Sequence, residues 1–193
     1  MPVVSGEYFV CPGAENTERV LALVRNRAEQ LRIGTVLVAS TSGATGARAA
    51  EVLRGLDVVV VRHSTGFAEE NQQELLVQHR QAIEANGGRI LTCQHAFGGV
   101  GRAVRKKLQT YQLDEIIAYT LRIFGEGVKV ACEISLMAAD AGLVKVGEPA
   151  LAVGGTGHGA DTALVLLPAN AQTFFDLRVM EVLCKPGFYP AEL

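Results

Sequence analysis

The sequence predicts an α/β fold with three layers, in which a doubly wound, mostly parallel sheet ends in an antiparallel hairpin. Two observations support this prediction. Continuous apolar runs rich in β-branched residues, typical of strands buried on both faces, alternate with segments whose apolar residues recur every three or four positions, typical of helices. Towards the carboxyl end, two apolar runs are joined by one glycine-rich loop whose length fits a hairpin.

The first half of the chain predicts strands that alternate with helices. After the apolar run 8–11, Asn16 or Thr17 can cap a helix that places Val20, Val24 and Ala28 on one face. Gly34 ends this unit before the next buried strand. The predicted strands are 8–11, 35–39, 56–61 and 90–93, and the predicted helices are 18–31, 44–53 and 71–85. Right-handed crossovers are expected to connect the parallel strands.

The second half predicts two neighbouring helices followed by the hairpin. The helices are expected at 113–124 and 128–141, around Gly125. Strands 150–153 and 161–167 flank the glycine-rich loop and should pair antiparallel, and a last apolar stretch covers 174–184. Since no repeat, low-complexity segment or linker interrupts the chain, we expect one domain over residues 1–193.

Composition limits the possible partners. The net charge of −2 gives no electrostatic reason to expect nucleic acid or an anionic membrane as partner, and no apolar run approaches the length of a membrane helix. The four cysteines are scattered, which argues against a metal site and for reduced thiols, and residues 1–7 lack signal-peptide features. We therefore expect a cytoplasmic protein, and its mean hydropathy of +0.23 favours a homo-oligomer.

The loop 40–46 is the most informative segment, because it lies between a buried strand and a helix. At that place a doubly wound sheet presents ligands to free amides and to the positive end of the helix dipole. Ser40, Thr41, Ser42 and Thr45 supply hydroxyls, and Gly43 would let an anion approach the backbone. An ordinary helix cap needs only one hydroxyl, so the loop predicts a phosphate site. It is no P-loop, since no Gly-Lys-Ser/Thr follows.

The loop 154–159 is the second candidate. It superficially matches the dinucleotide fingerprint, but that fingerprint needs a helix after it, and the residues that follow are β-patterned. Two interpretations remain open: a flexible hairpin tip, or a turn whose amides, with Thr156, His158, Asp161 and Thr162, clamp a ligand.

Two histidines follow strands at the same edge of the sheet as loop 40–46. His63 follows the third strand and His95 the fourth, so both are candidates for lining one cleft. Cys93 and His95 would face the same way in an extended segment, which makes a thiolate–imidazole pair conceivable beside a structural role. Glu133 and Asp140 share one helix face and could bind a polar ligand group or remain solvated or capping charges.

Several contiguous segments resemble a small family of bacterial and archaeal proteins with a fold like the C-terminal α/β domain of pyruvate kinase. The segments are YFVCPGAENTERV (8–20), VASTSG (38–43), FGEGVKV (124–130), MAADAGL (137–143) and AVGGTGHGADT (152–162). The resemblance implies that loop 41–45, Ala44 included, grips a phosphate and that the turn 154–162 covers the same ligand. Members of the family are known with flavin mononucleotide (FMN). An FMN ring would be lined by His63, Gly66, Phe67, His95 and the turn Gly154, Gly155, Thr156, Gly157, His158, Gly159.

The function expected from this resemblance is binding of a phosphorylated small molecule, FMN first, in a sensor, carrier or regulatory role. Pyruvate kinase activity is not expected, because that chemistry belongs to a separate barrel domain that 193 residues cannot also contain. Ala44 stands where pyruvate kinases often have an arginine, which weakens any claim for a bisphosphate. The alternatives are a flavin-dependent oxidoreductase that uses Cys93, His95 or His63, and a scaffold that acts through self-association. Whether the protein is an enzyme stays open.

Overall fold

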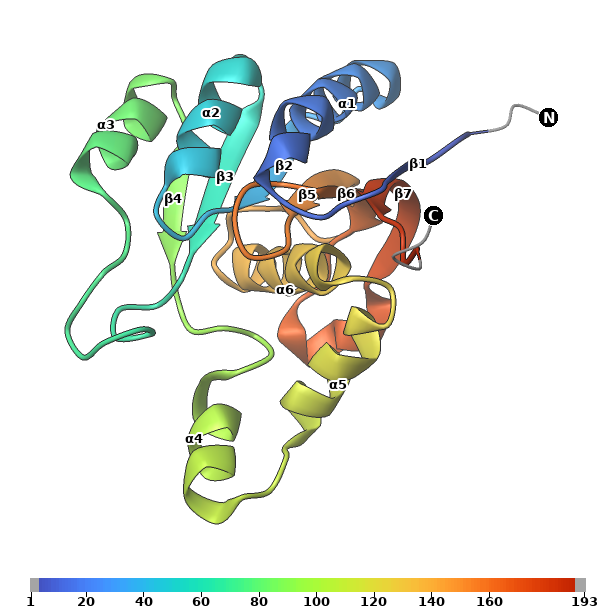
Figure 1. Cartoon of the computed structure of the whole chain (residues 1–193). Coiled ribbons are helices and arrows are strands. Elements are labelled where there is room, and N and C mark those ends of the chain that lie inside the picture. The colour runs from blue at the N-terminus through green and yellow to red at the C-terminus, as the bar shows by residue number, and fades with distance from the viewer. Residues whose placement is uncertain (1–3, 190–193) are drawn as a thin grey trace.

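A seven-stranded sheet with helices on both faces forms the molecule (Figure 1). The computed structural model describes residues 4–189. The segment 1–7, which lacks signal-peptide features, therefore lies partly outside the described residues. The strands are β1 (Glu7–Phe9), β2 (Thr35–Ala39), β3 (Asp57–Arg62), β4 (Arg89–Thr92), β5 (Ala150–Gly154), β6 (Thr162–Leu167) and β7 (Arg178–Pro186). The α-helices are α1 (Thr17–Leu31), α2 (Ala44–Val52), α3 (Val77–Ala85), α4 (Gly99–Leu108), α5 (Leu113–Arg122) and α6 (Glu126–Asp140); Ala14–Asn16 (η1) and Ala171–Asp176 (η2) are 3₁₀ helices.

The strand order confirms the predicted doubly wound, mostly parallel sheet. The order is β1-β7-β6-β5-β2-β3-β4, and only β6 runs against its two neighbours. The predicted hairpin is β5–β6, with Gly154 opposite Thr162, and β7 adds a second antiparallel pair to β6. The prediction is thus confirmed for fold class and hairpin.

Alternating side chains of the strands build a core on each face of the sheet. On β2, Val36 and Val38 pack under α1 and α2, while Leu37 between them packs under α6 on the other face. Every buried residue of α1 contributes to the first core, and the long apolar face of α6 dominates the second. This pattern explains why the strands are continuous apolar runs rather than alternating ones.

Three elements differ from the sequence prediction. The strand predicted at 8–11 is β1, which already ends at Phe9. The helix predicted at 71–85 begins only at Val77, because the preceding residues are drawn into tertiary contacts: Leu75 is buried in the core, and the Leu76 amide donates to the Ser42 carbonyl. Helix α4 was not predicted at all.

The topology brings the loops after β2, β3 and β4 to one edge of the sheet. These strands are parallel neighbours, so their carboxyl ends meet there. The antiparallel β5–β6 turn reaches the same edge, because β5 is the parallel neighbour of β2 on the other side. No helix among the described residues is long and apolar enough to cross a membrane.

Candidate functional site

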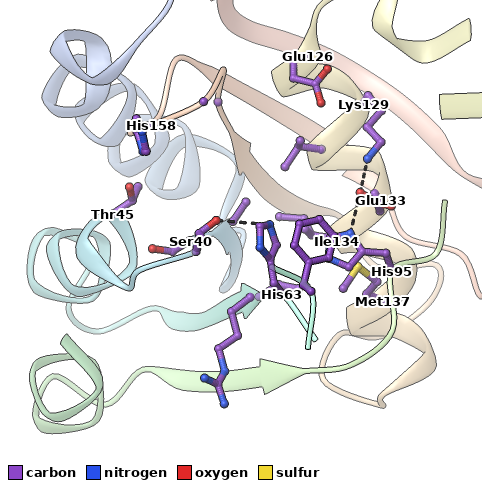
Figure 2. Close-up of a pocket in the computed structure, with 18 of the residues that line it drawn as sticks. Ser40, Thr45, His63, His95, Glu126, Lys129, Glu133, Ile134, Met137 and His158 are labelled. Atoms are coloured by element: carbon purple, nitrogen blue, oxygen red, sulfur yellow. Dashed lines mark hydrogen bonds and ion pairs between the residues drawn. The ribbon is translucent and has the colours of Figure 1, made fainter. Parts of the chain in front are cut away.

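A cavity of about 290 Å³ opens at this edge, between the β2–α2 loop, the β5–β6 turn and one side of α6 (Figure 2). Helix α6 contributes a row spaced by three and four residues, from Glu126 through Lys129 and Glu133 to Met137. The other lining residues are Ala39, Ser40, Thr41, Ser42, Thr45, Val61, Arg62, His63, Phe67, His95, Arg102, Arg122, Val130, Ile134, Gly155, Gly157, His158 and Gly159. The loops and both histidines singled out in the sequence therefore border one cavity.

The β2–α2 loop presents hydroxyls and free amides beside this cavity. The Gly46 amide donates to Ser40 Oγ at 3.0 Å, so Ser40 caps α2 from within the loop. The amides of Ala44 and Thr45, the first two residues of α2, have no hydrogen-bond partner among residues 4–189. Free amides at a helix start, the helix dipole and nearby hydroxyls, here those of Thr41, Ser42 and Thr45, are groups that favour an anion.

Gly43 has a packing role beside the one expected. Its φ is +93°, and a Cβ there would lie 2.3 Å from Leu75 Cδ1 and 2.6 Å from His79 Cβ. The His79 ring also contacts the Ser42 carbonyl oxygen at 2.9 Å through Nδ1. The missing side chain of Gly43 therefore lets Leu75 and α3 pack against the loop, while the approach of an anion to this backbone stays a prediction.

His63 is held between a carboxylate and a hydroxyl. Its Nδ1 lies 2.7 Å from Glu74 Oε2, and its Nε2 lies 3.4 Å from Thr41 Oγ1. A proton on Nδ1 donated to the carboxylate leaves Nε2 as an acceptor for the Thr41 hydroxyl. Glu74 was not foreseen, because it lies in the segment predicted as helix.

His95 belongs to a buried charged cluster with α6. Its Nδ1 is 3.6 Å from Glu133 Oε2, Lys129 pairs with the same oxygen, and the Phe97 amide donates to Glu133 Oε1 at 2.9 Å. Burial by itself would raise the pKa of Glu133, but the hydrogen bond from His95 and the Lys129 charge outweigh it and lower the pKa to about 2. Nε2 of His95 is buried without a partner among the described residues. A solvated role for Glu133 is thereby excluded.

Aromatic rings form a flat surface next to the histidines. The ring of Phe67 is stacked on that of His95, with centroids 4.8 Å apart at 18°, and lies 4.0 Å from that of His63. The Arg102 guanidinium lies 4.7 Å from the centre of the Phe67 ring. This cluster lies between the β2–α2 loop, which His63 contacts, and α4, which carries Arg102.

The basic side chains at the cavity were missed by the sequence analysis. Arg122 and Lys129 line it but are each paired with a glutamate of α6, whereas Arg102 takes part in no ion pair within the described residues. Arg62 also borders the cavity, but its guanidinium donates to Thr92 Oγ1, and burial lowers its pKa. The i, i+3, i+4 spacing on α6 was visible in the sequence, but nothing in it indicated that this face meets a cavity.

Hydrogen bonds to the side chain of Asp161 hold the β5–β6 turn in place. Its fully buried carboxylate accepts hydrogen bonds from the amides of Gly13 and Thr156 and from the hydroxyl of Thr162. Gly154 lies so close to the backbone of Gly127 that a Cβ would come within 2.4 Å of its carbonyl oxygen. The turn is therefore fixed against the start of α6 rather than a flexible tip.

Several predicted residues are placed away from the cavity. Asp161 and Thr162 are buried under the turn, so their side chains support the turn, and the clamp by its backbone amides stays a prediction. Gly66 lies in the loop after His63 and donates its amide to Gln72. The residues predicted to bind the cofactor that do not line the cavity are Gly43, Ala44, Gly66, Gly154, Thr156, Asp161 and Thr162.

The conceivable Cys93–His95 pair is not formed. Cys93 packs against the α6 core, and burial, with Asp140 and Glu133 nearby, raises the pKa of its thiol, whereas His95 turns to Glu133. The Asp140 carboxylate accepts hydrogen bonds from Asn170 Nδ2 and from the Ala171 amide. Asp140 thereby caps the start of η2. Among residues 4–189, no group of three or more His, Cys, Asp and Glu side chains is arranged to hold a metal ion.

Fold and site together define an α/β protein with a cavity at the carboxyl edge of its sheet. The model of the pyruvate kinase alpha/beta domain matches residues 18–166, and the chain belongs to this family. Similar solved structures include a pyruvate kinase from Cryptosporidium parvum (12% identity, TM-score 0.43, 79% of this chain and 23% of that chain). A Cryptosporidium parvum pyruvate kinase in complex with ADP is 11% identical (TM-score 0.39, 86% and 25%). This chain thus spans about a quarter of their length.

Proposed function

We propose that the cavity binds a phosphorylated small molecule, with FMN as the first candidate, and that the protein acts as a sensor, carrier or regulatory module. The observation that carries the proposal is the start of α2, where the free amide of Thr45 lies with the hydroxyls of Thr41 and Ser42 at one end of the cavity, and the free amide of Ala44 lies next to it in the chain. Arg102 adds a cation without a carboxylate partner among the described residues.

The residues at the cavity fit both parts of FMN. The phosphate would be held at the start of α2, and the stacked rings of Phe67 and His95 offer a flat surface for an aromatic ring. The unpartnered Nε2 of His95 could hydrogen-bond a polar atom at the ring edge. The volume of about 290 Å³ is near the lower end of the roughly 300–1,000 Å³ of small-molecule sites, so part of a ligand of this size would extend from the mouth.

A bound flavin would supply redox chemistry, and the chain would supply its orientation. With Cys93 away from the cavity, His63 and His95 are the remaining proton donors and acceptors for the oxidoreductase alternative. An absorbance spectrum of the purified protein, followed by addition of NADH and NADPH, separates the two functions. Absorbance bands at about 370 and 450 nm are typical of oxidised flavin. Loss of these bands on addition of NADH or NADPH would favour the oxidoreductase alternative.

The test of binding is the melting temperature with and without FMN. A ligand at about 100 times its Kd stabilises the native state by about 2.7 kcal/mol, which corresponds to a rise of a few degrees in a domain of this size. The variant Thr45→Val should reduce the rise, because it removes a hydroxyl from the loop, while Thr120→Val on the exposed face of α5 should leave it unchanged. No rise with FMN or with any phosphorylated metabolite would refute the proposal.

We further propose that the protein forms a homo-oligomer in which two copies of α5 pair antiparallel about a twofold axis. Leu113, Ile116 and Ile123 form an exposed apolar stripe on this helix. A twofold axis perpendicular to the helix makes the two copies antiparallel, so the stripe of one copy would cover the same stripe of the other. The high mean hydropathy of the chain is consistent with such an interface.

A further inference from the structure

Thr41, His63 and Glu74 form a hydrogen-bonded series at the phosphate end of the cavity. The three residues come from separate segments: the β2–α2 loop, the end of β3 and the segment before α3. The Glu74 carboxylate contacts Nδ1 of His63 at 2.7 Å, and Nε2 of His63 contacts the Thr41 hydroxyl at 3.4 Å. A hydroxyl next to a base that is itself oriented by a third group is the arrangement of an activated nucleophile, and such contacts are often longer without substrate.

The surroundings of this series favour a phosphoryl group as its target. The hydroxyl of Thr41 belongs to the same loop as Ser42 and Thr45, and it is followed by the free amides at the start of α2. Those amides suit the negative oxygens of a phosphoryl group, on which charge develops during transfer. Simple phosphate binding does not require that one hydroxyl of the loop be bonded to a carboxylate-oriented imidazole.

We propose that Thr41 accepts a phosphoryl group from an acyl phosphate bound in this cavity, with His63 as general base and Glu74 as a positioning residue. His63 Nε2 takes the proton of the Thr41 hydroxyl, and Oγ1 forms a bond to phosphorus. The bond from phosphorus to the acyl oxygen breaks, and its electron pair leaves with the carboxylate. The proton on His63 is then released to water, so the products are phosphothreonine and a carboxylic acid anion. The proposal rests on the phosphate site proposed above.

An acyl phosphate suits the site because its leaving group is a stable carboxylate, which needs no proton from the protein. Around the His63 ring lie Glu74, the ring of His95 at 5.1 Å and, across the Phe67 ring, the Arg102 guanidinium. Glu133 and Lys129 face it only through His95. As a general base, His63 must present a free electron pair on Nε2 to the Thr41 hydroxyl, which the Nδ1 contact with Glu74 favours.

The test is incubation of the full-length protein with acetyl phosphate, followed by mass spectrometry of the intact chain and of its peptides. We expect one phosphate on Thr41, none on Thr41→Val, and partial recovery in Thr41→Ser, which restores a hydroxyl. His63→Gln should slow the labelling by about 100-fold or more, the usual contribution of a general base. Glu74→Ala should also slow the labelling, because Nδ1 of His63 loses its partner, and Glu74→Gln, which keeps an acceptor for Nδ1, should restore part of the rate. Thr120→Val is the matched control and should label at the wild-type rate.

Binding is measured on the same samples, so that the two proposals fail separately. If FMN raises the melting temperature and slows labelling of Thr41, both proposals are supported. If FMN raises the melting temperature but Thr41 stays unlabelled, phosphoryl transfer is overturned and phosphate binding stands. If Thr41 is labelled equally in His63→Gln, the assignment of His63 as general base is overturned. If no phosphorylated compound raises the melting temperature and Thr41 stays unlabelled, both are overturned.

Discussion

At the scale of single residues, Gly43 determines how the β2–α2 loop packs against α3. Its left-handed φ and its contact with Leu75 and His79 leave no room for a side chain. In the sequence this glycine lay among hydroxyl residues and suggested an open approach to the backbone. The partner that fills this space lies more than thirty positions away in the chain, and only tertiary packing brings it there.

The variant Gly43→Ala should therefore be strongly destabilising. The strained φ costs about 1–3 kcal/mol, and the overlap with Leu75 and His79 adds about 1–3 kcal/mol. Gly55→Ala is the matched control, because Gly55 has nearly the same φ, +94°, but nothing within 4 Å of its added Cβ. Urea unfolding of both variants separates strain from overlap. Equal losses in the two variants would show that the contact with α3 has no energetic role.

The Glu133 carboxylate should make stability depend on acid pH. Its folded pKa of about 2 lies below the ordinary value of 4.5, so it contributes stability above about pH 4.5 that is lost as the pH falls towards 2. The contribution is at most about 3 kcal/mol at neutral pH. Urea unfolding at pH 6, 4 and 3 should show a smaller loss for Glu133→Gln than for the wild type. The variant itself is expected to be less stable at pH 6 by about 3–5 kcal/mol, because Lys129 is left buried and unpaired. An identical pH dependence in both proteins would contradict this assignment.

At the scale of elements, the site depends on two connections that local sequence describes poorly. The composition of the segment before α3 favours a helix. Glu74 and Leu75 nevertheless lie outside α3, because Glu74 contacts His63 and Leu75 packs in the core. Helix α4 starts in a glycine-dense stretch, Gly98 to Gly101, which lowers the helix signal although its later residues are basic and amphipathic. Arg102 was consequently not assigned to the site. By contrast, α1, α2 and β2 were predicted within one residue or two, because their apolar periodicity and their flanking glycines agree.

The β5–β6 turn should lose its shape when Asp161 is changed. Asp161→Asn keeps the volume of the side chain but places an amide NH₂ where a carboxylate oxygen accepts two backbone N–H groups. An unsatisfied buried group of this kind costs about 1–3 kcal/mol. Hydrogen exchange should show faster exchange of the Gly13 and Thr156 amides in the variant, and FMN affinity should fall because the turn covers the cavity. Unchanged protection of both amides would mean that Asp161 does not hold the turn.

At the scale of the whole molecule, the sequence predicted the layers and the edge of the sheet at which the cavity lies, but not the face of α6 that closes it. Apolar runs indicate which strands are buried on both faces, and the sheet and the hairpin were predicted from them. The cavity depends on where α6 crosses the edge of the sheet, and this follows from the close approach of Gly127 to Thr162 and Gly154. Apolar periodicity alone contains no information on such a contact between segments far apart in the chain.

The exposed stripe of α5 leads to a prediction for the oligomer. In sedimentation velocity the wild type should show the mass of a dimer or a larger species, and Ile116→Glu should reduce it towards the 20.5 kDa chain. Val77→Glu, at an even more exposed apolar position on α3, is the control and should leave the mass unchanged. A wild type that sediments as a monomer over a wide range of concentration would contradict the proposed pairing of α5.

The most direct test of the central claim is isothermal titration of the wild-type protein with FMN and with riboflavin, which differ only by the phosphate. If the start of α2 holds the phosphate, FMN should bind at least 10-fold more tightly, because charge-assisted hydrogen bonds contribute about 1.5–3 kcal/mol each. The difference should shrink in Thr45→Val. Equal affinities for FMN and riboflavin, or binding of neither, would contradict the account of this loop as a phosphate site for FMN.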